Sequence, residues 1–107
     1  MDYKGTWHIY EMELWGEDYF NMEVQAYVTI EGAGLGHFQF GLVSGEMDGE
    51  VIKEGTIEKF DFTWDGNDEC DSASGNGWLK IREKDVIEGM IKFHRGDRST
   101  FLARRVK

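Results

Sequence analysis

The sequence predicts an all-β protein built as a single closed antiparallel up-and-down barrel of about eight strands. Apolar and polar residues alternate along several segments, which is the pattern of strands with one buried face. Short turns rich in glycine, aspartate and asparagine separate these segments, and the 107 residues include no proline. Because such connections are too short for parallel crossovers, consecutive strands must pair antiparallel. Closing the sheet then removes the two exposed edges that would otherwise remain.

The clearest strand lies at residues 24–30, where every even position, from Val24 to Ile30, is aliphatic. The alternation returns at residues 38–42 and 60–64 and, less regularly, in the last third of the chain, while the glycine-rich residues 32–36 favour a hairpin turn. We expect strands at residues 5–14, 22–31, 36–44, 46–53, 56–64, 76–83, 86–94 and 98–106. We expect turns at residues 48–49, 53–55, 65–68, 84–85 and 95–97, and a short helical turn across one barrel mouth within residues 15–21.

The composition limits the classes of function. Twenty-one acidic residues against twelve basic ones leave a formal charge of −9, which repels phosphate backbones and anionic lipid headgroups, so we expect no nucleic-acid and no membrane partner. The chain shows neither a signal segment nor an apolar run of membrane-spanning length, and we expect it in the cytoplasm. Cys70 is the only cysteine, which excludes an intramolecular disulfide and a cysteine zinc cluster. Residues 1–107 are expected to form one domain, without a cofactor.

The start and the end of the chain resemble those of a known superfamily. Gly5-Thr6-Trp7 is similar to the Gly-x-Trp that opens the first strand of lipocalins and fatty-acid-binding proteins, the calycins. In calycins the indole closes one barrel end and an arginine of the last strand packs across it. The resemblance therefore implies a buried Trp7 covered by Arg104 or Arg105. The chain departs from lipocalins in its shorter length, in lacking a C-terminal helix and in lacking Thr-Asp-Tyr after the third strand.

The chain as a whole also resembles a group of small bacterial proteins without an assigned activity. The shared segments are the Gly-Thr-Trp-His start, Phe-Gly-x-Val-x-Gly at residues 40–45 and Trp-x-Gly-x-Asp-Glu at residues 64–69. This second resemblance implies no particular ligand or reaction.

Three groups of residues offer chemistry, and each has a structural explanation beside the functional one. The acidic run at residues 65–71 places oxygen ligands at alternate positions, yet it lacks the glycine and glutamate that complete a calcium loop, so we expect a solvated turn and no metal. His8, His37 and His94 fall on three expected strands without a short ligand spacing. His94 stands near Asp97 and Ser99, where the alternatives are an acid–base pair and an ordinary hairpin turn.

Two further features have the same ambiguity. Cys70 lies among carboxylates that disfavour its thiolate, which makes it a poor nucleophile. Glu11 and Glu13 continue the strand face of Trp7 and Ile9, so the alternation of the first strand switches partway. A bulge near Tyr10 explains that switch, and a carboxylate pair pointing into the barrel mouth is the functional alternative.

The expected function is binding rather than catalysis, because no activated nucleophile is evident. Eight strands enclose a space that side chains can fill or that holds one small ligand. We expect a small, partly apolar ligand at the mouth away from Trp7, lined by Tyr10, Met12, Trp15 and Tyr27, with inward-facing rings filling much of the interior (Phe38, Phe40, Phe60, Phe62 and Trp64). The alternative is a ligand-free barrel that acts as a protein-interaction module or homodimer through an exposed aromatic patch of Trp15, Tyr19 and Trp78.

Overall fold

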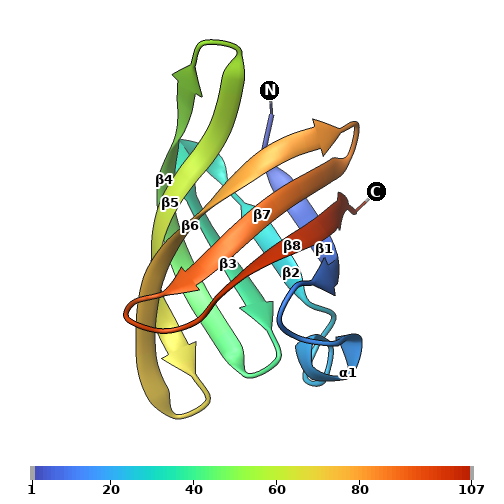
Figure 1. Cartoon of the computed structure of the whole chain (residues 1–107), viewed down its shortest axis with the longest axis vertical. Helices are drawn as coiled ribbons and strands as arrows, with labels where there is room; N and C mark the ends of the chain where they lie inside the picture. The colour runs from blue at the N-terminus through green and yellow to red at the C-terminus, as the bar shows by residue number, and fades with distance from the viewer. Residues whose placement is uncertain (1, 107) are drawn as a thin grey trace.

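The computed structural model describes residues 2–106 and shows an all-β protein, a closed antiparallel barrel of eight strands (Figure 1). Each strand pairs with the next along the chain, and β8 pairs with β1 to close the ring. The predicted fold class is therefore confirmed. The elements are β1 (Gly5–Met12), α1 (Glu17–Phe20), β2 (Tyr27–Ile30), η1 (Gly32–Gly34), β3 (Leu35–Phe40), β4 (Val43–Glu54), β5 (Ile57–Asp68), β6 (Asp71–Glu83), β7 (Val86–Phe93) and β8 (Arg98–Arg105).

Several expected boundaries are wrong. The second strand begins at Tyr27 rather than at residue 22, and Val24 is 44% exposed. The turns expected at residues 48–49 and 65–68 lie inside β4 and β5, and the chain reverses instead at residues 69–70. The reason is that Gly66 faces the interior directly opposite Gly45 of β4, while its polar neighbours point to solvent. Residues typical of turns thus serve here as the solvent face of a long strand.

Aromatic rings that lie over glycines of neighbouring strands fill the barrel interior. The five rings expected to point inward are all at most 3% exposed, and Phe38 meets Trp64 edge to face with ring centroids 5.2 Å apart. A Cβ atom added at Gly45 would lie 2.8 Å from the Trp64 ring and 2.9 Å from the Phe38 ring, and one at Gly77 would lie 2.7 Å from Phe62. The rings therefore occupy the space that side chains at these glycine positions would need, in keeping with the close packing of protein interiors.

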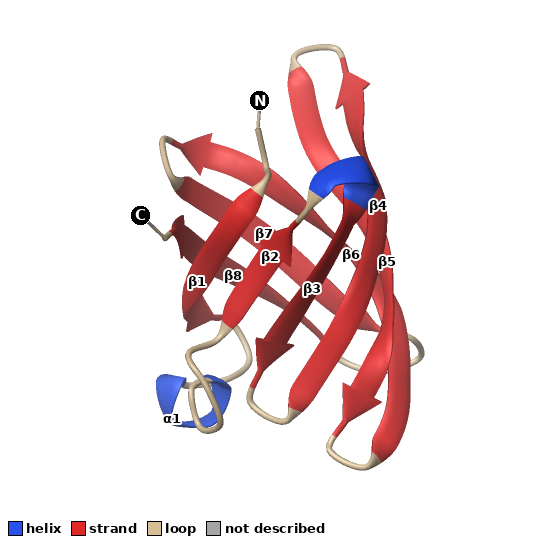
Figure 2. Cartoon of the chain, turned by 180° about the vertical axis from the view of Figure 1, so that it is seen from behind, coloured by secondary structure: helices blue, strands red, loops and turns tan. Residues whose placement is uncertain are grey.

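The end of the barrel near α1 is sealed by the segment between β1 and β2 (Figures 1 and 2). The expected helical turn is present at residues 17–20, and it inserts Phe20, which is 2% exposed. The Phe20 carbonyl accepts a hydrogen bond of 2.9 Å from the backbone N–H of Gly41, which ties the helix to the β3–β4 turn. Trp15 packs beside Phe40 with ring centroids 5.2 Å apart. Apolar side chains close this mouth.

The opposite end is uneven because neighbouring strands differ in length. β3 has 6 residues and β4 has 12, and their pairing stops at Leu35 opposite Asp48. Among the strands of residues 2–106, β5 is therefore the one partner of residues 49–54 of β4, and the pairing of β5 with β6 stops at Phe60 opposite Leu79. The tip of the β4–β5 hairpin stands out beyond the barrel wall (Figure 1). This step in the wall leaves an open groove at the Trp7 end.

Candidate functional site: the groove at the Trp7 end

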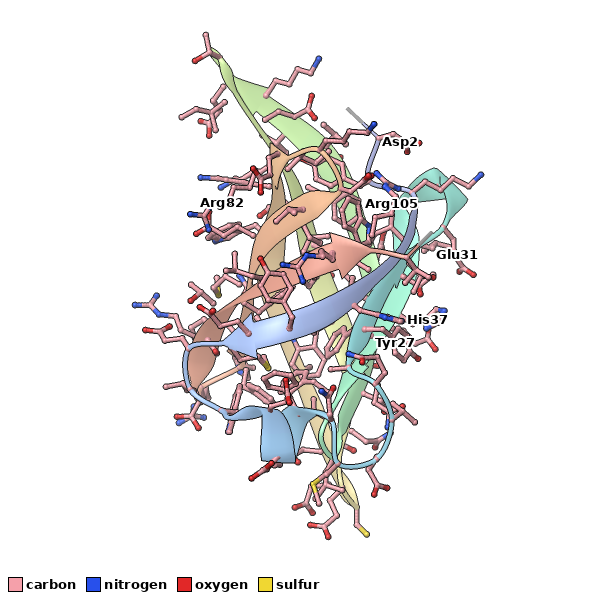
Figure 3. The ribbon with its side chains drawn as sticks, turned by 90° about the vertical axis from the view of Figure 1, so that its right-hand side faces the viewer. Asp2, Tyr27, Glu31, His37, Arg82 and Arg105 are labelled. Carbon is pink, nitrogen blue, oxygen red and sulfur yellow. The ribbon has the colours of Figure 1, made fainter. Side chains whose placement is uncertain are left out.

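The N-terminal segment, residues 2–4, is fastened across the barrel end by Trp7 and Arg105. Trp7 is fully buried, and its indole N–H donates a hydrogen bond of 2.9 Å to the Tyr3 carbonyl. The guanidinium of Arg105 lies 4.2 Å from the centre of the Trp7 ring and donates to the carbonyls of Lys4 at 2.6 Å and Asp2 at 2.9 Å. Its Nε donates to Asp85 at 3.0 Å. Figure 3 shows Arg105 beside the segment that carries Asp2.

This fastened segment forms one wall of an open groove of about 590 Å³. The second wall is η1 with the end of β2, and the third is the edge of β4 at residues 49–51; Figure 2 shows η1, in blue, against β4. The volume lies in the range of roughly 300–1,000 Å³ that small-molecule sites occupy. We call this space the Trp7-end groove. It is lined by Asp2, Tyr3, Lys4, Ile30, Glu31, Gly32, Ala33, Gly34, Gly49, Glu50, Val51 and Phe60.

The floor of the Trp7-end groove is apolar and uncharged. Tyr3, Ile30 and Phe60 are each at most 4% exposed, and the Tyr3 and Phe60 rings lie 5.8 Å apart. Burial raises the pKa of Tyr3 above its ordinary value of 10.0, and the Glu58 carboxylate raises it further, while a hydrogen bond with the backbone of Ile81 acts in the opposite direction. Tyr3 therefore remains a neutral phenol at physiological pH.

The rim of the Trp7-end groove is acidic. The residues that line the groove include three acidic ones, Asp2, Glu31 and Glu50, and one lysine, Lys4. The acidic character continues over the outer face of β4 and β5, where exposed carboxylates lie directly opposite one another in two cross-strand pairs, Glu46 with Asp65 and Glu50 with Asp61. Like charges so placed repel, and the summed field favours a cation or a neutral molecule over an anion.

The structure does not bring the four residues of the expected ligand mouth together. Met12 and Trp15 lie at the α1 end, Met12 7% exposed and Trp15 packed against the core, where Phe20 already closes the barrel. Tyr10 and Tyr27 lie on the outer face. Tyr10 packs under Arg104 at 4.0 Å because the register of β1 and β8 shifts between Ile9 and Glu11. The Tyr27 hydroxyl is 3.3 Å from His37 Nδ1. Figure 3 shows the two side chains next to each other.

Of the two arginines considered for Trp7, Arg105 makes the contact. Successive strand residues point to opposite faces, so Arg104 faces outward and Arg105 turns over the barrel end. The burial of Trp7 and its cover by a last-strand arginine agree with what the Gly-x-Trp pattern implied.

For the remaining candidate residues, the structure favours the structural explanation over the functional one. Glu11 and Glu13 are exposed, and the bulge expected near Tyr10 is present. Ser99 is fully buried and accepts the backbone N–H of Leu14 at 3.1 Å, so it is engaged away from the exposed His94 and Asp97. Within residues 2–106, no group of three or more histidine, cysteine, aspartate or glutamate side chains is arranged to hold a metal ion. Cys70 is exposed in the β5–β6 turn.

The aromatic residues of the expected interaction patch are separated. Trp15 and Tyr19 lie 6.0 Å apart at the α1 end, both partly buried against the core. Trp78 lies on the outer face of β6, directly opposite Met90 of β7, with the Lys80 ammonium 5.0 Å from its ring. The three side chains therefore do not form one exposed patch.

Sequence reasoning missed the Trp7-end groove. Tyr3 precedes the first strand and belongs to no periodic pattern, and the free edge of β4 depends on how far each partner strand extends. The one available signal was the glycine-rich run at residues 32–36, which was expected to turn the chain and also makes one wall.

Comparison with known proteins found no matching protein family, no similar curated protein and no similar solved structure. Among residues 2–106, no helix has the length and apolar character needed to cross a membrane.

Proposed function

We propose that this protein is a non-catalytic binding protein that holds a small, partly apolar molecule in the Trp7-end groove. The observation that carries the proposal is a space of about 590 Å³ with an apolar floor, at one end of a barrel whose interior is filled by its own side chains. The proposed ligand site is therefore at the Trp7 end, opposite the mouth that was expected from the sequence. The Gly5-Thr6-Trp7 pattern and the Arg105 cover support a calycin-like relationship, and the single cysteine supports a cytoplasmic location, both as part of this proposal.

The chemistry of the rim narrows the ligand. Three acidic residues and one lysine line the groove around its apolar floor, so an apolar body with a neutral or positively charged end fits better than a fatty acid or another anion. The groove is open to solvent, which suits a ligand that is only partly desolvated.

A neutral solvatochromic dye tests the proposal. We expect saturable uptake at one dye per chain, and we expect Val51→Asp to weaken dye binding about tenfold because it places a charge beside the apolar floor. Val51 is 48% exposed and lines the groove, whereas Ile57, which is 57% exposed on the same hairpin, does not line it. Ile57→Asp is therefore the matched control and should leave the affinity unchanged. Equal loss in both variants, or no saturable uptake by the parent protein, would refute the proposal.

The alternative function, a protein-interaction module or homodimer, is favoured by a different observation, the free edge of β4. A homodimer formed through this edge alone would bury far less than the roughly 1,200–2,000 Å² of a stable interface. We therefore expect a single monomer mass in sedimentation equilibrium at micromolar concentration.

A further inference from the structure

Residues 49–54 of β4 form a strand edge that lacks a strand neighbour, although η1 lies against it at Gly49. They pair with β5 on one side, and among residues 2–106 no strand pairs with them on the other, because β3 begins opposite Asp48. In an antiparallel pair, every second residue directs its N–H and C=O away from the partner. The outer side of this edge thus offers alternating backbone donors and acceptors, the arrangement that pairs with an added strand.

The edge lies against the Trp7-end groove rather than in open solvent. Gly49, Glu50 and Val51 line the groove, with the apolar floor of Tyr3 and Phe60 beside them. An extended segment paired with this edge would therefore direct every second side chain toward an apolar surface. This juxtaposition supplies a contact for side chains in addition to the backbone hydrogen bonds.

The other face of the same edge carries negative charge. Glu50 and Glu54 stand two strand periods apart on the outer face, with Ile52 between them, and both carboxylates are exposed. On the opposite face, Lys53 is already engaged with Glu58 at 3.6 Å. A strand added here is therefore favoured when its outward side chains are basic, since opposite charges across two strands attract.

We infer that residues 49–54 are a docking edge for an extended segment of a partner protein in which apolar residues alternate with lysine or arginine. The segment joins the β4–β5 hairpin as an additional strand, its apolar side chains on the groove side and its basic side chains beside Glu50 and Glu54. A second copy of this chain fits less well, because its own edge brings the same two carboxylates and a further charge of −9. This activity goes beyond the binding of a small molecule, although it uses one wall of the same groove.

A six-residue peptide that alternates valine and lysine is the probe, blocked at both ends and carrying a fluorescent label. We expect saturable binding in fluorescence anisotropy that weakens with added salt, and no binding of the same peptide with glutamate in place of lysine. In hydrogen exchange, peptide addition should slow amides of residues 49–54 at alternate positions about tenfold, because those amides become paired. Binding without protection of these amides would overturn the inference.

Paired charge reversals separate the edge from the general negative field. Glu50→Lys with Glu54→Lys should weaken peptide binding about tenfold, since two attractive cross-strand pairs become repulsive. Glu46→Lys with Asp65→Lys changes the net charge by the same amount at exposed positions of β4 and β5 within the barrel wall. This control should change the affinity less than about twofold. Equal weakening by both pairs would show that only net charge attracts the peptide. Because these readouts do not use the dye, failure of small-molecule binding leaves this test intact.

Discussion

The two ends of the barrel are covered in different ways. At the α1 end, the connection between β1 and β2 folds across the opening and inserts Phe20, so that the mouth is closed by apolar packing. At the Trp7 end, the short N-terminal segment is held by backbone carbonyls that accept from Arg105 and Trp7, and the wall beside it is left incomplete. Apolar packing covers the mouth at the α1 end, whereas polar fastening beside a step in strand length leaves a groove at the Trp7 end.

The difference between the two ends follows from the lengths of their connections and strands rather than from their amino-acid composition. Aromatic residues lie near both ends, yet only the α1 end has a connection long enough to bring its own plug. At the Trp7 end the connection between β2 and β3 is the short turn η1, and β4 runs on past it paired with β5 but not with β3. A ligand site is therefore expected where a long strand extends beyond the end of its neighbour.

Removal of the plug at each end should give the largest effects. Phe20→Ala and Trp7→Ala should each lower the free energy of unfolding by about 3–5 kcal/mol, measured by urea denaturation, because both delete a buried aromatic side chain. At urea concentrations below the denaturation midpoint, dye binding should distinguish the two variants. Trp7→Ala releases the wall that contains Tyr3 and should lose the dye site, whereas Phe20→Ala should retain the dye site. The reverse pattern would place the ligand at the α1 end.

An intermediate effect is expected from the arginine that fastens the N-terminal segment. Arg105→Met removes two hydrogen bonds to carbonyls, the contact with Asp85 and the cover of Trp7, and should cost about 2 kcal/mol, since its side chain is partly exposed to solvent. Arg104→Met is the matched control, because Arg104 is exposed and packs on the outward Tyr10 ring. Its cost should stay below about 1 kcal/mol. Equal costs for the two arginines would mean that the fastening contributes nothing.

The smallest effect concerns Tyr3 and alkaline pH. Its pKa is raised in the folded protein, so the stability linked to its neutral form is fully present below the ordinary value of 10.0 and is lost as the pH rises from there through the raised value. Tyr3→Phe should therefore show a shallower decline in melting temperature above pH 10 than the parent protein. An identical decline in both proteins would contradict the burial of Tyr3 as the cause.

The fold could be predicted largely from the sequence, and the site could not. Alternation such as Phe60, Phe62 and Trp64 reports which face of a strand is buried, and eight such segments with short turns leave few topologies. The residue types at positions 65–68 led to an incorrect turn prediction, because the same polar residues are common in turns and on the solvent face of a strand. Tyr27 was placed at the mouth although the alternation of Val28 and Ile30 assigns it to the outer face, where the structure has it. The groove depends on where β3 ends relative to β4, a relation between strands that no local pattern encodes.

The most direct test of the central claim is to locate the bound dye by NMR. In a titration of the neutral dye into the labelled protein, backbone amides at Gly32–Gly34 and at residues 49–51 should shift in a saturable manner, while those at Glu17–Phe20 and at residues 41–42 should remain unchanged. That result would place the ligand in the Trp7-end groove beside the free edge of β4. Shifts confined to Glu17–Phe20 and its neighbours would contradict the account, because they would show that the apolar plug opens and that the ligand enters at the α1 end.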